Sequence, residues 1–451
     1  MKTIEGKQII SNEKVYPSFP TPQNLQTYKF SMIDQIVGPS PIPLMLFFPG
    51  NPESFEARIR LLKDSLSLVL SRFFPLAGRM SEDGQSIDCN DQGVPFIVAK
   101  IEGKMISDSM ITRNSPSEAS VVTRLYPCEI NLSTQFGPGD SMAMFQVNQF
   151  ECGGMAIAMV LCHEFMDGIT TGHFVRSWAA AARVSSSESV CPNYIAQSLF
   201  PQYEEMKLQK VRPSVSIVKD GKSVVRRFVF DSSAINILKE KSLVERPTRV
   251  EVVSAFMWKC FMVASLANNK SVSVVTHAVD LRKRSRPQFA PDCLGNLFAM
   301  AAAACTNQHE TELGHLVRKI RSSVSMIDGD YVARMLGDQG FLGYLKNLEN
   351  TWSEVPNDAD LLFIVSWCNL GIFKADFGWG NPIWIDRCLT SGDLVYMNGV
   401  WLVETGNGDG IEAWVTLGDK YMQEFEKIDE LQALASIDPQ PITCTLINGL
   451  C

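Results

Sequence analysis

Two short motifs, far apart in the sequence, contain the residues of this chain that are best suited to chemistry. The first, His-Glu-Phe-Met-Asp-Gly, begins at His163 and places Asp167 four residues after the histidine. The second, Asp-Phe-Gly-Trp-Gly, begins at Asp376 and sets one carboxylate in a loop of glycines and aromatic residues. An imidazole titrates near neutral pH, so His163 can accept the proton of a hydroxyl group that is hardly ionised there. The residue types therefore predict general-base chemistry at His163.

Asp167 has two interpretations, and the spacing leaves both open. Residues four apart share one face of a helix, which would let Asp167 orient and stabilise His163 as in a catalytic relay. Gly168, however, permits a tight turn directly after the aspartate, and a turn does not keep helical geometry between the two side chains. The alternative is that Asp167 fixes the loop that carries the histidine, and the glycine favours this second role.

Asp376 also has two interpretations. Phe377 and Trp379 suit packing, while Gly378 and Gly380 allow backbone angles that are closed to other residues. This composition is typical of a rigid loop, in which Gly378 and Trp379 are structural residues. In the alternative, Asp376 is a second catalytic acid or base. The composition favours the structural loop and does not remove the catalytic alternative.

Cys162 precedes His163 and raises a further alternative, a thiol nucleophile. Neighbouring residues on a strand point to opposite faces, so these two side chains should not meet. The sequence also lacks the Gly-x-Ser-x-Gly elbow of serine hydrolases, a Walker-type phosphate loop and a Gly-x-Gly-x-x-Gly dinucleotide fingerprint. These absences argue against the enzyme classes that depend on those motifs.

The elements around the first motif predict that His163 lies at the end of a strand. Residues 142–148 and 155–161 are apolar runs separated by Gly153 and Gly154, a pattern typical of two buried strands. A helical pattern follows at 169–183. Strand ends are common positions for reacting groups, because rigid backbone meets an open edge there.

The second half of the chain alternates predicted strands with predicted helices, so we expect a mixed α/β fold. Its clearest elements are strands at 223–230, 271–279 and 361–367 and a helix at 249–266. With 451 residues the chain is too long for one ordinary core. Residues 185–222 are rich in serine and proline and poorly patterned. We therefore expect an N-terminal domain over 1–184, a crossover linker over 185–222 and a C-terminal domain over 223–451.

Composition and charge narrow the range of partners. The formal charge of −8 and the isoelectric point near 5.3 argue against nucleic acid or an anionic membrane. No apolar run approaches the ~18 residues of a membrane span, and the amino terminus lacks the apolar stretch of a secretory signal. The 12 cysteines are scattered, without a pair or cluster at zinc spacing. We expect a cytoplasmic protein with reduced cysteines, no metal and no membrane partner.

The two motifs, their order and their flanks resemble the BAHD family of plant coenzyme-A-dependent acyltransferases. The resemblance extends over nearly the whole chain. It also covers segments at 20–23, 34–35, 74–79, 88–96, 150–154, 247–251 and 295–296. Within the family, these segments are most similar to the alkaloid O-acetyltransferases.

This resemblance implies a fold and a site. It implies two similar-sized domains of chloramphenicol-acetyltransferase-like topology, with a central solvent channel between them and His163 midway along it. Asp167 would point away from the cavity and pair with Arg282, which makes Gly168 and Arg282 structural residues. The loop at Asp376 would lie away from the reacting centre, although this aspartate is often counted as catalytic in the family. The family expectation is also a monomer.

A coenzyme A site needs cations for the phosphates and an apolar tunnel for the pantetheine. Arg249 begins the predicted helix at 249–266, where the helix dipole favours phosphate, and Lys259 lies further along it. The run from Lys283 to Arg286 is another candidate. Asn296 is predicted to bind the cofactor as well, from its place in a family-like segment. Each of these cations is also typical of an ordinary solvated surface.

The implied reaction is transfer of an acyl group, with acetyl-CoA as donor and a hydrophobic plant alcohol, an alkaloid by resemblance, as acceptor. His163 would remove the hydroxyl proton during attack on the thioester carbonyl, and the imidazolium would then protonate the departing thiolate. The alternatives are a malonyl, benzoyl or hydroxycinnamoyl donor, a non-catalytic binding homologue, and a thioester or ester hydrolase. A donor carboxylate would require a cation in the pocket, whose position the sequence does not give.

Two departures from the family pattern bear on the acceptor. Glu164, Phe165 and Met166 are bulkier and more acidic than the residues frequent in the subgroup, so we expect an acceptor that differs from those of its relatives. Asn369 follows Trp367 and Cys368 where relatives commonly carry arginine. Any role of that arginine is therefore lost or moved in this chain.

Overall fold

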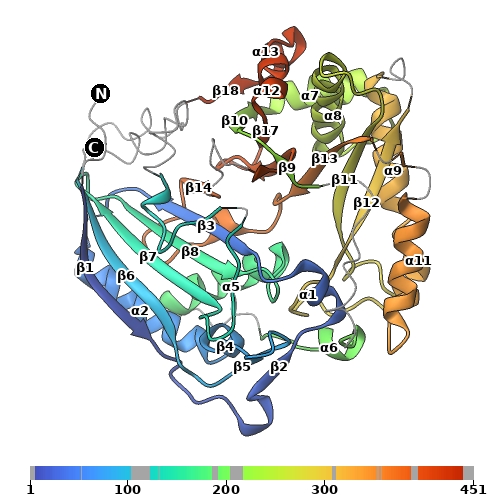
Figure 1. The fold of residues 1–451 in the computed structure, drawn as a ribbon. Helices are drawn as coiled ribbons and strands as arrows, with labels where there is room; N and C mark the ends of the chain where they lie inside the picture. Colours follow the sequence, from blue (N-terminus) through green and yellow to red (C-terminus); the bar gives the residue numbers. More distant parts are fainter. Residues whose placement is uncertain are drawn as a thin grey trace.

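The computed structural model describes residues 6–51, 53–102, 122–131, 133–184, 191–203, 217–306, 311–352, 355–356, 358–387 and 395–439. Two large mixed sheets organise these residues, and helices pack against both of them (Figure 1). The mixed α/β fold with two domains that the sequence predicts is thereby confirmed.

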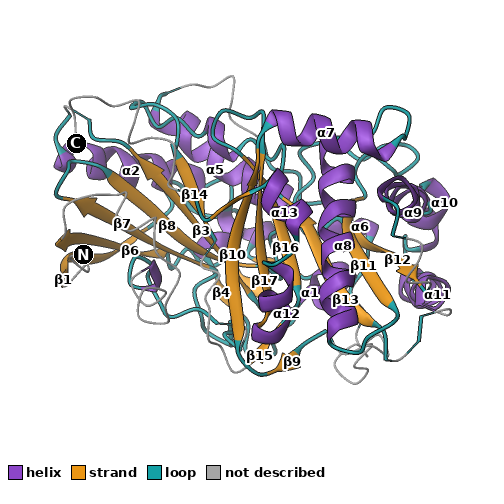
Figure 2. Cartoon of the chain, turned by 90° about the horizontal axis from the view of Figure 1, so that it is seen from above, coloured by secondary structure: helices purple, strands orange, loops and turns teal. Residues whose placement is uncertain are grey.

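The first sheet comes from the N-terminal half except for its last strand. Its order is β1-β6-β7-β8-β3-β14, in which only β6 and β7 pair in parallel. The strands are β1 (Gly6–Val15), β3 (Pro41–Phe48), β6 (Val94–Glu102), β7 (Ala143–Phe150), β8 (Met155–Cys162) and β14 (Trp384–Asp386). Helices α2 (Phe55–Leu70) and α5 (Gly168–Ala182) cover one face of this sheet (Figure 2). The Trp178 indole of α5 donates a 3.1 Å hydrogen bond to the Leu62 carbonyl of α2, which fixes the two helices together.

The second sheet has the order β12-β11-β13-β16-β17-β10-β18, and β13 pairs in parallel with β11 and with β16. Its strands are β10 (Ser223–Phe230), β11 (Ser273–Asp280), β12 (Phe298–Cys305), β13 (Asp360–Ser366), β16 (Gly399–Glu404), β17 (Ile411–Gly418) and β18 (Ser436–Ile437). The helices that pack against it are α7 (Ser232–Ser242), α8 (Arg249–Ala267), α9 (Leu313–Ser325) and α12 (Asp419–Phe425). The predicted strands and helix of this half are present, with boundaries that shift by at most two residues.

Smaller elements connect and flank the two sheets. The short strands are β2 (Thr27–Lys29), β4 (Arg79–Met80) and β5 (Ser86–Asp88), which form one sheet, and β9 (Lys219–Asp220) paired with β15 (Val395–Tyr396). The remaining α-helices are α1 (Met32–Val37), α6 (Ala196–Leu199), α10 (Gly329–Arg334), α11 (Gly340–Trp352) and α13 (Asp429–Leu434). Short 3₁₀ turns occur at Gln23–Leu25, Phe74–Ala77 and Ile372–Lys374.

The strand that precedes the first motif is fully enclosed. All eight residues of β8 are buried, between β3 on one side and β7 on the other. A strand buried on both faces reads as a continuous apolar run, which is why the sequence at 155–161 predicts it well. Directly after β8, the His163 N–H donates a 2.8 Å hydrogen bond to the Ser40 carbonyl. The histidine is therefore held at a rigid sheet edge.

The second motif belongs to the C-terminal half in sequence but packs on the first sheet. Strand β14 pairs with β3, and the Phe377 ring lies 5.9 Å from Phe48 and 5.1 Å from Trp178. The chain thus crosses back to the first sheet between β13 and β15. The domain boundaries at 184 and 223 remain predictions. Much of the predicted linker, at 185–190 and 204–216, lies outside the described residues.

Helix α8 is the one helix among the described residues that is long and apolar enough to cross a membrane by length and composition. Two thirds of its most apolar stretch is buried against the second sheet and its covering helices, with Trp258 and Phe261 almost fully enclosed. A helix that is apolar on all sides and buried in this way is typical of a protein core.

Candidate active site

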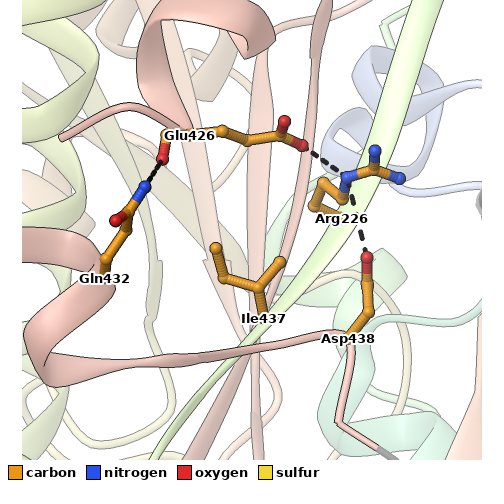
Figure 3. A pocket seen from close by; sticks show the side chains of 5 residues that line it. All are labelled: Arg226, Glu426, Gln432, Ile437 and Asp438. Carbon is orange, nitrogen blue, oxygen red and sulfur yellow. Dashed lines mark hydrogen bonds and ion pairs between the residues drawn. The ribbon is translucent and has the colours of Figure 1, made fainter. Parts of the chain in front are cut away.

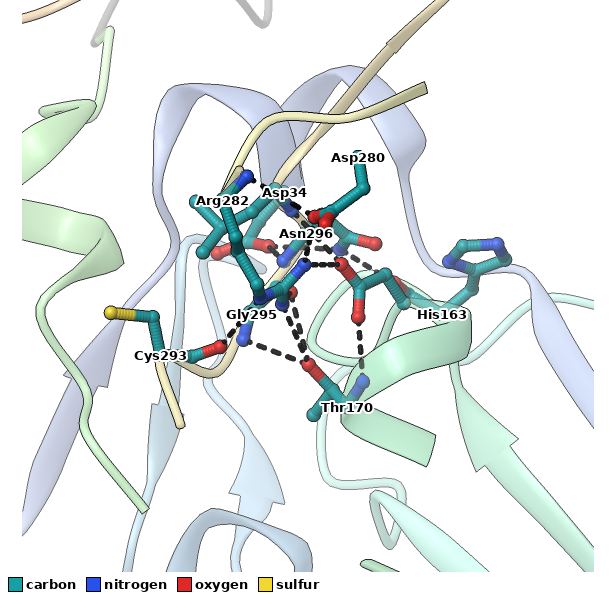
Figure 4. A network of polar contacts seen from close by, with 10 residues as sticks. Asp34, His163, Thr170, Asp280, Arg282, Cys293, Gly295 and Asn296 are labelled. Atoms are coloured by element: carbon teal, nitrogen blue, oxygen red, sulfur yellow. Dashed lines mark hydrogen bonds and ion pairs between the residues drawn. The ribbon is translucent and has the colours of Figure 1, made fainter. Parts of the chain in front are cut away.

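His163 lies on the short loop between β8 and α5, at the seam between the two sheets. Its carbonyl accepts a 2.7 Å hydrogen bond from the Asn296 side-chain amide, which belongs to the segment before β12. Its ring centroid is 6.3 Å from that of Phe298, the first residue of β12. Figure 4 shows the imidazole pointing away from the polar network beneath it. Both halves of the protein therefore fix the backbone of His163 and leave its ring projecting from the network.

Asp34 and Asn296 form the buried contact under the histidine. The Asp34 carboxylate accepts hydrogen bonds of 3.0 Å from the Asn296 main-chain N–H and 2.8 Å from its side-chain amide. The same aspartate forms a capping box with Ser31 at the start of α1. Burial raises the pKa of Asp34 to about 6, although these hydrogen bonds oppose the rise. Asn296 is fully buried and donates to the His163 carbonyl, and its role in cofactor binding stays a prediction.

Asp167 does not face His163 but pairs with Arg282. One carboxylate oxygen accepts from the Thr170 N–H at 2.7 Å and so caps α5, while the other accepts from Arg282 at 2.8 Å and from the Leu297 N–H at 3.2 Å. Arg282 also donates to Asp280, and both side chains of the Asp167–Arg282 pair are buried. The pair therefore clamps the start of α5 to the segments that flank β11 and β12.

The electrostatics of this pair follow from its burial and its charges. Burial alone would raise the pKa of Asp167, but the charge and hydrogen bond of Arg282 outweigh it, and the pKa lies below its usual value. The Asp167 and Asp280 carboxylates likewise outweigh burial at Arg282 and raise its pKa. Both groups are thus ionised over the whole physiological range. An aspartate committed to an arginine in this way orients the loop and is not placed for a proton relay to His163.

Burial also sets the protonation of His163 and Glu164. It lowers the pKa of His163, and the nearby Arg387 charge adds to the effect. The Nδ1 atom of His163 is buried and has no hydrogen-bond partner on another described residue. Burial, together with the charge of Asp34, raises the pKa of Glu164 to about 8. At neutral pH the site therefore contains a neutral imidazole beside a protonated carboxyl group.

Asp376 organises the loop of the second motif. One carboxylate oxygen accepts 2.8 Å hydrogen bonds from the N–H groups of Gly378 and Gly380, both of which have positive φ angles of 110° and 97°. The other oxygen lies 3.6 Å from Arg183, the residue after α5. Helix α5 has 15 residues, so its two ends are about 22 Å apart, with His163 beyond the opposite end. This position does not support the catalytic alternative for Asp376 and favours the structural loop.

The cations predicted to bind coenzyme A differ in whether they already form ion pairs with other residues. Arg249 lies 3.4 Å from Glu404 and also hydrogen-bonds the Asn369 side chain and the Gly408 carbonyl. Lys259 lies 2.7 Å from Glu430. Both are thus held in intramolecular ion pairs, which an incoming phosphate would have to replace.

The cations that follow Arg282 in the sequence differ from Arg249 and Lys259 in their exposure and their ion pairs. Lys283 and Arg286 are exposed, and no ion pair joins either to another residue in the described part of the chain. Arg284, between them, donates to the carbonyls of Val324 and Ile327 and is structural. Lys283 and Arg286 are therefore the better placed of the predicted cations to receive a phosphate.

Sequence reasoning missed two participants in this site. Asp34 falls in a family-like segment, but its spacing from Asn296 gives no sign that the two side chains meet. Arg387 lies in no motif, and only the crossing of β14 to the first sheet brings it near His163. Glu164 departs from the family pattern in the sequence, yet its raised pKa depends on burial that a sequence does not reveal.

Two cavities among the described residues lie away from His163. One of about 390 Å³ is an open surface feature bordered by Arg226, Glu426, Gln432, Ile437 and Asp438 (Figure 3). Arg226 pairs there with Glu426 and Asp438, so its polar groups satisfy one another. A second, of about 160 Å³, lies at the end of α8. Neither borders His163, and the central channel stays a prediction.

A family model, curated relatives and a solved structure all match this chain over nearly its whole length. The model of the Transferase family matches residues 7–432. The epi-neemfruitin B 7-O-acetyltransferase of Melia azedarach is 36% identical over 96% of this chain and 99% of its own length. The (13S,14R)-1,13-dihydroxy-N-methylcanadine 13-O-acetyltransferase of Papaver somniferum is 32% identical over 93% and 96%. The crystal structure of vinorine synthase superposes with a TM-score of 0.80 at 30% identity, covering 96% of this chain and 99% of that one.

The Asp167–Arg282 pair yields a prediction about stability. Arg282→Met would leave the Asp167 carboxylate buried without its counter-ion, so we expect the free energy of unfolding to fall by about 3–5 kcal/mol. Urea denaturation at pH 7 measures this change. Lys283→Met, at the exposed neighbouring position, is the control and should shift the value by less than about 0.5 kcal/mol. Equal values for the two variants would contradict the clamp.

The Asp376 loop yields a second prediction. Asp376→Ala removes the acceptor of two main-chain N–H groups and the partner of Arg183. We expect a loss of about 1–3 kcal/mol in the free energy of unfolding. Asp64→Ala, an exposed aspartate on α2, serves as the matched control in the same urea titration. If Asp376→Ala is as stable as the control, the carboxylate does not order the loop.

Proposed function

Because this chain belongs to the BAHD acyltransferases of the Transferase family, we propose that it transfers an acetyl group from acetyl-CoA to a hydroxyl of a hydrophobic plant metabolite. The relatives act, by name, on epi-neemfruitin B and on a dihydroxylated N-methylcanadine. An alkaloid is therefore one acceptor to test among several classes of plant alcohol. The observation that carries the proposal is the position of His163, whose backbone is fixed by both halves of the protein and whose imidazole projects from the network that holds it.

In the proposed reaction His163 acts as general base. Its imidazole takes the proton of the acceptor hydroxyl while that oxygen attacks the thioester carbonyl carbon. The resulting tetrahedral intermediate collapses, the carbon–sulfur bond breaks, and the imidazolium gives the proton to the coenzyme A thiolate. The products are the acetyl ester and the free thiol, so no proton or electron is gained or lost overall. A positioned base of this kind is worth about 10²- to 10⁴-fold in rate.

The residues around His163 support this role by position and by charge. The carbonyl of His163 is held by Asn296, and the helix that follows it is clamped by the Asp167–Arg282 pair. These three residues do not contact the reacting atoms in this scheme and are positioning residues. A base works only when its geometry is kept within a fraction of an ångström, which explains why buried, paired groups surround it.

For the donor, we propose that Lys283 and Arg286 receive phosphates of coenzyme A. They are exposed and lie within four residues of Arg282, whose side chain pairs with Asp167 in the histidine motif. Arg249 and Lys259 remain further candidates, at the cost of breaking their ion pairs with Glu404 and Glu430. We further propose that the enzyme works as a cytoplasmic monomer without a metal.

The first test of this function is acetyl transfer by the His163→Ala variant. The protein is incubated with acetyl-CoA and a panel of plant alcohols, and both thiol release and product mass are followed. We expect kcat/KM to fall by about 10²- to 10⁴-fold in the variant, because the hydroxyl loses its base. The melting temperature should stay close to the native value, since the ring projects from the network and its loop is held through the backbone.

The Asp376→Ala variant, an assay for free acetate and a coenzyme A binding assay distinguish the alternatives. Asp376→Ala should keep kcat/KM within about threefold of the native enzyme, because its carboxylate lies about 22 Å along α5 from the histidine end. Activity that survives in His163→Ala but collapses in Asp376→Ala would reverse the two roles. Free acetate formed without an acceptor would favour a hydrolase, and the absence of coenzyme A binding would favour a binding homologue.

The pH dependence gives a further prediction. The pKa of His163 is lowered, so the fraction of neutral base falls only below the ordinary histidine value. We expect kcat/KM to be flat at pH 7 and to decline on the acidic side below about pH 6.5. Because burial raises the pKa of Glu164 to about 8, Glu164→Gln mimics its neutral form and should keep activity at pH 7 within about twofold. An acidic limb centred above pH 7, or a large loss in Glu164→Gln, would contradict this electrostatic description.

A further inference from the structure

Arg387 is a half-buried cation that the proposed reaction does not use. It directly follows β14, the strand that crosses from the C-terminal half to the first sheet. Its guanidinium carbon lies 3.8 Å from the ring centroid of Trp367, after β13, and 5.6 Å from that of Trp401, on β16. A guanidinium stacked on tryptophan is held in a defined orientation, because the ring face attracts the cation and limits its rotation.

In this stacked position, two side-chain nitrogens of Arg387 donate no hydrogen bond to a described residue. Nε and Nη1 of Arg387 are buried and have no hydrogen-bond partner among the residues that the structure describes. The carboxylate of Asp386 accepts a 3.0 Å hydrogen bond from the Tyr126 hydroxyl. Burial lowers the pKa of Arg387 to about 9, so the group still carries its charge at neutral pH. An ionised group with unsatisfied buried donors costs stability, and such groups in native proteins call for a functional explanation.

The surroundings of Arg387 place it near the start of α5, the helix that follows His163. Trp367, on which it stacks, lies against the start of α5: a Cβ built on Gly168 would be 4.0 Å from the indole nitrogen. Gly168 belongs to the motif that His163 begins, and the Arg387 charge contributes to the lowered pKa of His163. The stacking on Trp367 therefore brings this cation to the segment that links His163 to α5, and its effect on the His163 pKa agrees with that position.

We propose that Arg387 binds a carbonyl or carboxylate oxygen of the substrate held at His163 and so helps to select that substrate. The inference rests on the proposed function, since it assigns the substrate to the same site. An arginine N–H donates and never accepts, so it suits an electron-rich oxygen and repels an ammonium group. The oxygen can belong to the acyl donor, as the free carboxylate of malonyl-CoA does, or to a carbonyl group of the acceptor.

Arg387 is a cation of the kind that a donor carboxylate would require, at a position that the sequence does not give. Asn369, two residues after Trp367, accepts a hydrogen bond from Arg249 and so does not pair with Arg387. Arg387 reaches Trp367 from another part of the chain. A cation at this site therefore favours neutral or acidic oxygen-rich substrates over acceptors whose protonated amine would lie beside it.

The test uses Arg387→Met, which keeps length and apolar contact with the tryptophans but removes the charge and all N–H donors. Arg60→Met, an exposed arginine on α2, is the matched control. In the donor arm, calorimetry compares the dissociation constants of malonyl-CoA and acetyl-CoA. In the acceptor arm, it compares matched plant alcohols with and without a carbonyl group in the presence of coenzyme A. Binding is measured directly, so this test stays informative even if acetyl transfer fails.

The expected result is a preference of the native enzyme for the oxygen-bearing ligand in one arm, and that arm identifies the source of the oxygen. The preference should fall by about 10- to 100-fold in Arg387→Met and stay unchanged in Arg60→Met. No preference in either arm, or a preference that survives in Arg387→Met, overturns the inference. An equal loss of affinity for all ligands also overturns it, because it indicates a general structural role, which thermal melting of the variant would reveal.

Discussion

The buried ion pair between Asp167 and Arg282 is the contact on which the geometry of the site depends. It joins the start of α5, which follows the first sheet, to the segment after β11 in the second sheet. Two charges removed from water are retained only when each is fully compensated, and here the carboxylate has three donors and the guanidinium contacts several acceptors. Such a pair tolerates few alternative arrangements. Any relative shift of the two sheets at this point would break it, so the pair fixes the position of the histidine loop between them.

A second contact between the two halves lies at the other end of α5. There the Asp376 loop packs Phe377 on Phe48 and Trp178, and the chain then enters β14 beside β3. The two motifs that stand out in the sequence therefore hold opposite ends of one helix. One is an ion pair beside the reacting centre, and the other is an aromatic and glycine loop remote from it. Both motifs hold the halves together, and in the proposed reaction only the first also carries a reacting group.

Burial sets the charge state of the whole site. It keeps His163 neutral and Glu164 protonated near neutral pH, whereas Asp167 stays ionised because Arg282 compensates it. Arg387 adds a fixed positive charge on the side of the tryptophans. A neutral base beside a fixed cation is consistent with proton transfer from an alcohol and with recognition of an electron-rich oxygen. One physical factor, the removal of these groups from water, thus connects the proposed catalysis with the proposed selectivity.

The sequence by itself determined the fold class, the strands on either side of Gly153 and Gly154, the helix after His163 and the two motifs, because each depends on local patterning of apolar residues and glycine. It favoured an orienting Asp167 and a structural Asp376 loop, but it left the alternatives open and assigned Asn296 to the cofactor. The contacts in the structure add that Asp167 pairs with Arg282 and that the Asp376 carboxylate lies beside Arg183, at the end of α5 away from His163. Asn296 meets Asp34 and His163, and β14 brings Arg387 to Trp367, through contacts between residues far apart in the chain. Such contacts, and the pKa shifts that burial produces, depend on how the sheets pack, which the spacing of residues along one chain does not encode.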